Sequence, residues 1–181
     1  FRQGVIDMLG AAKWLRSEGH PTLGLFGYSL GAYLAGIMAA VKDDWAFVVL
    51  GGAGDSPVSP ILDTPLGRNV REDLEACGML DRVRLARAWK VISPGAFRPR
   101  VPKERILMIA GRYDRIMLPA SVRRLWRAWG RPPIRWKPWR WRAAASAAVR
   151  SGRLTAAAGG GVGAACCCAV AAVNNDSDRE G

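Results

Sequence analysis

One serine in this sequence stands in a setting that favours nucleophilic chemistry. Ser29 is the central residue of the pentapeptide Gly-Tyr-Ser-Leu-Gly, at residues 27–31. The apolar run at 22–26 predicts a strand buried on both faces, and the apolar residues after the pentapeptide recur at helical spacing. Glycines two residues before and after the serine let strand and helix pack closely around a strained turn. We therefore expect a nucleophile elbow that exposes the serine hydroxyl.

The residues around Ser29 would also stabilise negative charge. Leu30 begins the expected helix, so its backbone N–H points to where an oxyanion would form on a substrate carbonyl. Gly27, Tyr28 and Gly31 complete the elbow. The alternative is a buried serine in an ordinary glycine turn, because this glycine–serine pattern is common by chance in glycine-rich sequences.

An aspartate follows a second apolar strand. Residues 105–110 predict the strand, and a Gly-Arg-Tyr-Asp turn then ends at Asp114. Residues just past the carboxyl ends of parallel strands gather at the sheet edge where the sites of α/β folds are built. A carboxylate at that edge can orient an imidazole. The alternative is a turn aspartate that caps the following helix.

These two motifs, in this order, resemble the α/β-hydrolase superfamily over about residues 1–136. The resemblance implies an α/β fold, with a mostly parallel sheet flanked by helices. It also implies a serine esterase or related acyl hydrolase that cleaves a small-molecule acyl substrate through an acyl-enzyme, without cofactor or metal. Ser29 would be the nucleophile, Asp114 the acid, and a histidine after the last strand would complete the triad.

The sequence departs from this pattern at the general base. Its one histidine, His20, precedes the strand that leads to Ser29, and strand geometry places it about 20 Å from that serine. No histidine follows the expected last strand at 133–136. With the catalytic histidine absent, we expect a partial hydrolase fold that is inactive as it stands. A pseudoenzyme that uses the cleft only for binding is an alternative.

Composition divides the chain into two parts. Residues 1–136 predict a hydrolase-like core fragment with a helical, cap-like insertion at about 66–95, whereas residues 137–181 are rich in Ala, Gly and Arg and predict a disordered tail. We consider a lost reading frame as the origin of this tail. Strands are expected at 22–26, 45–51, 105–110 and 133–136. In the family, further strands precede the strand that leads to the nucleophile, and this sequence shows none before residue 22. The strand at 22–26 would then have an unpaired apolar edge that favours self-association.

The charge suggests a different function. The 27 Lys and Arg residues exceed the 15 Asp and Glu residues, for a net charge of +12. Such an excess can mark binding to nucleic acid or to anionic membranes. Its strongest form is at 131–142, where Trp136, Trp139 and Trp141 alternate with basic residues. Misread GC-rich codons would produce the same composition, so we expect no specific nucleic-acid partner.

The remaining features point to a reduced, cytoplasmic setting. The uncharged run at 155–173 approaches the length of a membrane span, but Ala and Gly dominate it, so we expect no transmembrane segment. The adjacent cysteines at 166–168 lack the spacing of a zinc site. Cys77 stands alone at an apolar helical position and is expected to be buried packing.

Overall fold

The computed structural model describes residues 1–138 and 166–172, and within them the strands form one five-stranded sheet of order β4-β3-β2-β1-β5. Strands β1, β2, β3 and β4 run parallel to one another, and β5 runs antiparallel to β1. Their bounds are β1 Leu23–Ser29, β2 Val48–Gly51, β3 Ile106–Gly111, β4 Ile134–Lys137 and β5 Cys166–Ala172. The four parallel strands are the ones that the sequence predicts.

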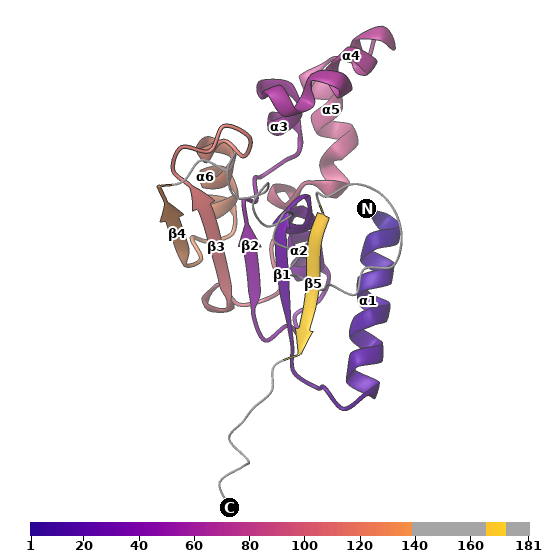
Figure 1. Ribbon diagram of the computed structural model, residues 1–181, viewed down its shortest axis with the longest axis vertical. Coiled ribbons are helices and arrows are strands. Elements are labelled where there is room, and N and C mark those ends of the chain that lie inside the picture. Colours follow the sequence, from indigo (N-terminus) through magenta and orange to yellow (C-terminus); the bar gives the residue numbers. More distant parts are fainter. Residues whose placement is uncertain (139–165, 173–181) are drawn as a thin grey trace, which may run out of the picture.

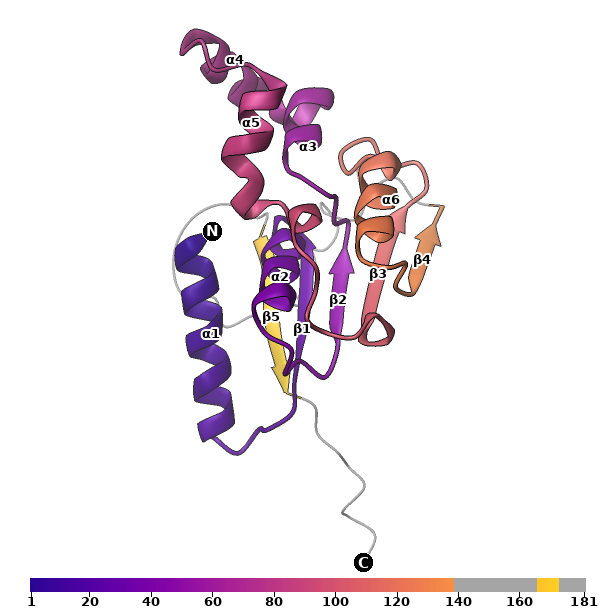
Figure 2. The same cartoon turned by 180° about the vertical axis from the view of Figure 1, so that it is seen from behind.

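Helices α2 (Leu30–Val41) and α6 (Pro119–Ala128) cover one face of the sheet, and α1 (Arg2–Ser17) lies on the side of β5 (Figures 1 and 2). Alternate strand residues point to opposite faces. Leu25 and Leu50 are fully buried, whereas Phe26 points to the opposite face and is 41% exposed. The expectation that the first strand is buried on both faces is therefore wrong for the described residues.

Within the segment that is predicted to be a disordered tail, the structure describes one strand, β5. Residues 166–172 pair with the whole of β1, from Leu23 opposite Ala172 to Ser29 opposite Cys166. The pairing gives the backbone groups along the edge of β1 hydrogen-bond partners. The edge of β1 that the sequence analysis expects to be unpaired is thus occupied. The rest of the predicted tail, 139–165 and 173–181, lies outside the described residues.

The insertion between β2 and β3 is helical, as predicted. It contains α3 (Val58–Asp63), α4 (Arg68–Ala76) and α5 (Arg82–Ala88), here called the cap helices. These helices rise beyond the carboxyl ends of β1, β2 and β3, with α4 farthest from the sheet (Figures 1 and 2). Short 3-10 turns complete the connection at Pro65–Gly67, Trp89–Ile92, Pro94–Ala96 and Lys103–Arg105. Cys77, expected to be buried, is exposed.

The tryptophan-rich basic stretch begins inside the fold. Trp136 belongs to β4 and packs against the hydrophobic core, with the Arg123 guanidinium 5.0 Å from the centroid of its ring. Trp139 and Trp141 lie outside the described residues. In the part of the chain that the structure describes, no helix combines the length and the hydrophobicity needed to cross a bilayer.

Candidate active site

Ser29 ends β1 and immediately precedes α2. Its backbone has φ 54° and ψ −121°, a conformation that L-residues rarely adopt. Among the described non-glycine residues, only Arg131 also has a positive φ. The Ser29 side chain is partly exposed and makes no capping hydrogen bond to α2. The Ser29 hydroxyl therefore does not help to hold the helix.

Close packing of strand against helix explains the first glycine of the motif. A Cβ atom on Gly27 would lie 2.4 Å from the carbonyl oxygen of Gly31 and 2.8 Å from the Cα of Ala32. Both atoms belong to the backbone, so neither can move aside cheaply. Only glycine at this position lets α2 begin directly beneath Ser29.

The backbone N–H of Leu30 is placed for anion stabilisation. Leu30 is the first residue of α2, so its N–H is among the four that have no partner inside the helix. The helix macrodipole adds partial positive charge at this end. Tyr28 lies beside the elbow, where its ring would be 3.1 Å from a Cβ placed on Gly51.

Asp114 is held by one carboxylate oxygen only. It is 3% exposed, and its Oδ1 accepts hydrogen bonds from the backbone N–H groups of Ile116, at 2.8 Å, and Met117, at 2.9 Å. Oδ2 is buried and has no hydrogen-bond partner among the described residues. Burial raises the pKa of Asp114, and the two backbone N–H groups oppose that rise. The turn thus offers one acceptor oxygen to a donor that these residues do not supply.

Ser29 and Asp114 lie at the same edge of the sheet. Strands β1 and β3 flank β2 in parallel register, with Tyr28 opposite Gly51 and Gly51 opposite Ile109. Two strand spacings separate β1 from β3, roughly 10 Å. His20 precedes β1 and therefore lies near the opposite edge, as predicted. The structure brings together the predicted nucleophile and acid but not the one histidine.

Tyr33 connects the two turns. It lies one helical turn after Ser29 on α2 and is buried, and its hydroxyl donates a hydrogen bond to the Ser56 carbonyl at 3.1 Å. The same hydroxyl is 3.5 Å from the sulfur of Met117, whose N–H binds Asp114. Burial raises the pKa of Tyr33, so this residue stays protonated and remains a donor. The turns that carry Ser29 and Asp114 are therefore packed against each other through Tyr33 and Met117.

The site predicted from the sequence does not include a second carboxylate at this edge, that of Asp55. Asp55 follows β2, and its Oδ1 accepts from the Ser121 hydroxyl at 2.5 Å while its Oδ2 accepts from Arg124 Nε at 2.7 Å. The hydrogen bond to Asp55 raises the pKa of Arg124. The same end-of-strand rule that selects Asp114 could have found Asp55. Because both oxygens of Asp55 are occupied, it ties the β2 loop to α6 rather than offering an acceptor.

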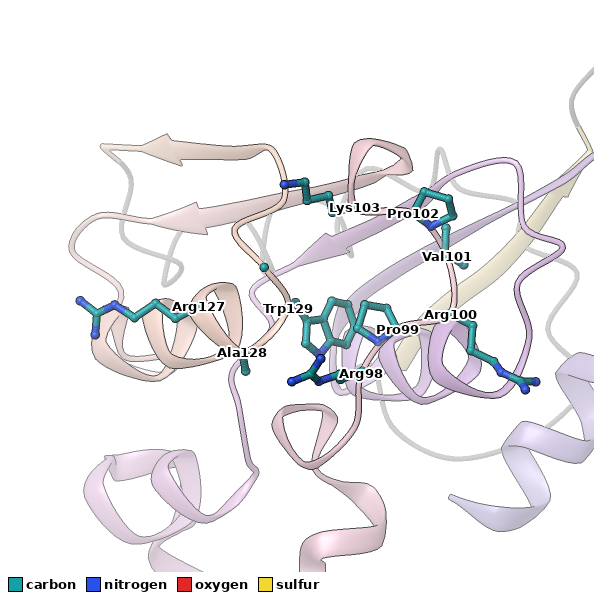
Figure 3. Close-up of a pocket in the computed structure, with 10 residues that line it drawn as sticks. Arg98, Pro99, Arg100, Val101, Pro102, Lys103, Arg127, Ala128 and Trp129 are labelled. Carbon is teal, nitrogen blue, oxygen red and sulfur yellow. The ribbon is translucent and has the colours of Figure 1, made fainter.

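Two hollows of the surface, of about 480 and 460 Å³, lie away from this edge. Segments that precede β1, β2 and β3 line the smaller one. The larger one lies between the segment before β3 and the end of α6, and its lining residues include four cations and no acid (Figure 3). Arg127 and Arg100 point away from each other there, so these cations do not converge on a common ligand (Figure 3). In the described part of the chain, no three metal-binding side chains cluster.

Curated relatives of this chain carry no stated activity. An uncharacterized protein of Mycobacterium tuberculosis strain H37Rv is 34% identical over 145 residues, which cover 75% of this chain and 32% of the relative. The uncharacterized protein YdjC of Bacillus subtilis is 32% identical over 72 residues, 40% of this chain and 61% of that protein. This chain thus spans about a third of the mycobacterial relative. No protein-family model matches the sequence.

Solved structures support the fold. The acylaminoacyl peptidase of Pyrococcus horikoshii superposes with a TM-score of 0.58 at 15% identity, over 75% of this chain and 23% of the peptidase. A hydrolase from Pseudomonas aeruginosa covers 72% of this chain and 62% of its own, with a TM-score of 0.43 at 15% identity. The similarity to the peptidase confirms the predicted fold class, a parallel sheet flanked by helices of the α/β-hydrolase type.

Proposed function

We propose that this chain carries the nucleophile and the acid of a serine hydrolase that cleaves small-molecule ester or other acyl substrates. The observation that carries the proposal is the backbone of Ser29, held at φ 54° between strand β1 and helix α2. Backbone strain of this kind costs stability and clusters at functional sites. The fold shared with the peptidase is consistent with this chemistry but does not assign it.

Each residue has a distinct part in the proposed reaction. Ser29 Oγ attacks the acyl carbon, and the negative charge that develops on the carbonyl oxygen is stabilised by the N–H of Leu30. An imidazole takes the serine proton and returns it to the leaving alcohol, thiol or amine as the bond to the acyl carbon breaks. Asp114 Oδ2 accepts the other imidazole N–H and thereby sets its tautomer. Water then hydrolyses the acyl-enzyme by the same route.

The imidazole is the missing component. The sequence contains one histidine, and His20 lies near the wrong edge of the sheet. Triad members act as a unit, and the loss of the base costs on the order of a millionfold in turnover. We therefore expect the chain alone to hydrolyse esters no faster than its Ser29→Ala variant does.

Free imidazole provides a direct test, because it can supply the missing base if it reaches both Ser29 Oγ and Asp114 Oδ2. The full chain is mixed with a nitrophenyl ester and increasing imidazole, and the release of nitrophenol is followed. We expect a rate that saturates with imidazole and exceeds the uncatalysed imidazole reaction by up to about a hundredfold, a typical contribution of a general base. Intact-mass analysis should find one acyl group on Ser29.

Three variants decide the outcome. Ser29→Ala should abolish both the saturable rate and the acyl adduct, and Asp114→Asn should weaken the saturation by imidazole. Ser17→Ala, a change of an exposed serine at the end of α1, is the matched control and should behave as the parent chain. A rate that is linear in imidazole and independent of Ser29 would reject the hydrolase proposal. Tight binding of acyl ligands without any adduct would instead favour the pseudoenzyme.

A further inference from the structure

The outer part of the cap exposes apolar side chains that no described residue covers. Helix α4 contains no buried residue, and in α5 only Leu85 is buried. Figures 1 and 2 show α4 at the tip of the cap, away from the sheet. The exposed apolar residues of this region are Leu66 at 60%, Val70 at 39%, Met79 at 41%, Leu80 at 40% and Val83 at 59%.

Apolar residues along α4 and its two flanks form a stripe. Leu66 in the preceding 3-10 turn, Val70 and the half-buried Leu74 on α4, and the C-terminal cap Cys77 recur at intervals of four, four and three residues, which is the spacing of one helix face. A nine-residue helix is too short to be stable on its own propensity and normally depends on packing of its apolar face. The exposed stripe therefore marks a contact surface.

The two helices differ in charge. Helix α4 carries three acids, Glu72, Asp73 and Glu75, beside two arginines, of which Arg71 donates hydrogen bonds to the backbone carbonyls of Ile61 and Thr64. Helix α5 carries three arginines and no acid. Asp73 lies three residues after Val70, at the border of the stripe, and Arg87 lies one turn after Val83 on the exposed face of α5. Among the described residues, neither Asp73 nor Arg87 has an ion-pair partner.

We propose that the α4–α5 face of the cap is a dimerisation surface whose partner is a second copy of this chain. A two-fold arrangement places α4 of one copy against α5 of the other and repeats the contact in reverse. Both apolar stripes are then covered, and Asp73 of each copy faces Arg87 of the other. Because the acids lie on α4 and α5 carries only arginines, a second copy supplies complementary charge to both helices at once, so the surface fits itself best.

Charge reversal tests this pairing in the full chain. Sedimentation velocity should show concentration-dependent dimers, and Asp73→Arg and Arg87→Asp should each weaken dimerisation at least about tenfold, since like charges would then face each other. An equimolar mixture of the two variants should restore dimers, because both contacts of the mixed pair are again attractive. Glu18→Arg, an exposed reversal on the other side of the molecule, is the control and should leave the dimer unchanged.

Cys77 provides a second readout that needs no variant. Its thiol is exposed on the stripe, and peptide mapping separates it from the cysteines at 166–168. Its rate of alkylation should fall as protein concentration rises, with the midpoint seen in sedimentation. Monomers at all concentrations, dimers that both reversals leave intact, or no recovery on mixing would overturn the proposal. So would slow alkylation at every concentration, since another segment of the same chain would then cover the stripe.

The dimer and the proposed hydrolase can fail separately. Neither α4 nor α5 carries a residue placed in the candidate active site, and the two reversals do not touch Ser29 or Asp114. Association through a sheet edge would also survive both reversals, so that mode of self-association is distinguished from contact through the cap.

Discussion

The turns that carry Ser29 and Asp114 follow parallel strands at the same sheet edge, yet they hold their side chains by different means. At Ser29 the backbone is strained and the side chain is free of capping contacts. At Asp114 the backbone needs no positive φ, but the carboxylate is buried and one of its oxygens has no partner among the described residues. In both turns the candidate side chain is held at a local cost, which is backbone strain at Ser29 and desolvation at Asp114.

The source of support also differs between the turns. Neighbouring backbone atoms close the Ser29 turn sterically, since Gly27 leaves no room for a Cβ atom. Hydrogen bonds hold the Asp114 turn, and the packing of Tyr33 against Met117 connects it to the elbow. Substitution of Gly27 should therefore cause a large loss of stability at the Ser29 turn. At the Asp114 turn, stability should instead depend on pH.

The largest expected effect is the loss of steric support at Gly27. Gly27→Ala places a methyl group against two backbone atoms of α2 and should lower the free energy of unfolding by about 3 kcal/mol. Urea denaturation measures the change. Gly10→Ala in α1, where an added Cβ meets no atom within 4 Å, is the control and should raise stability by about 0.5–1 kcal/mol. If Gly27→Ala melts like the parent chain, the elbow is not sterically closed.

A smaller effect of opposite sign is expected at Asp114. Its raised pKa means that the folded chain holds this proton more tightly than the unfolded chain, in which the carboxyl has its ordinary pKa of 3.8. The stability linked to this group is therefore full below that pH and is lost as the pH rises through the raised value. Asp114→Asn avoids this loss and should be more stable at pH 7 by about 1–2 kcal/mol.

Unfolding curves between pH 4 and pH 8 check this expectation, because the advantage of Asp114→Asn should shrink toward the acid end. Asp55→Asn is the matched control at the same sheet edge. Asp55 is paired with Ser121 and Arg124, so its loss should destabilise the chain at neutral pH. An Asp114→Asn chain that is less stable at pH 7 would mean that a donor outside the described residues already satisfies Oδ2.

The smallest expected effect separates strain from side-chain chemistry at Ser29. Ser29→Gly removes the steric cost of the positive φ, because glycine has no Cβ. Ser29→Ala keeps that cost and removes only the hydroxyl. The glycine variant should be more stable than the alanine variant by about 1 kcal/mol. Thermal unfolding of both variants measures the difference. Equal stabilities would show that the Ser29 backbone stores no strain, and the comparison between the two turns would then lose its basis.

Much of the fold could be predicted from local sequence. The four parallel strands lie within a few residues of their predicted bounds, because each is a short apolar run bounded by turn residues. Strand β5 could not be predicted, since its Ala and Cys residues have no distinctive period and pair only because the edge of β1 is available. The prediction that Cys77 is buried is wrong, because helical spacing identifies an apolar helix face but not what covers that face.

The sequence by itself determined the strand, turn and helix around Ser29 and the turn that carries Asp114, because glycine placement and apolar spacing act within a few residues. It also determined that no histidine follows Asp114. Only the tertiary structure decided that, within the described part of the chain, Asp114 Oδ2 lacks a partner, both oxygens of Asp55 are occupied and the apolar stripe along α4 is uncovered. These properties depend on contacts between distant segments, and the packing of the whole sheet and its helices sets those contacts.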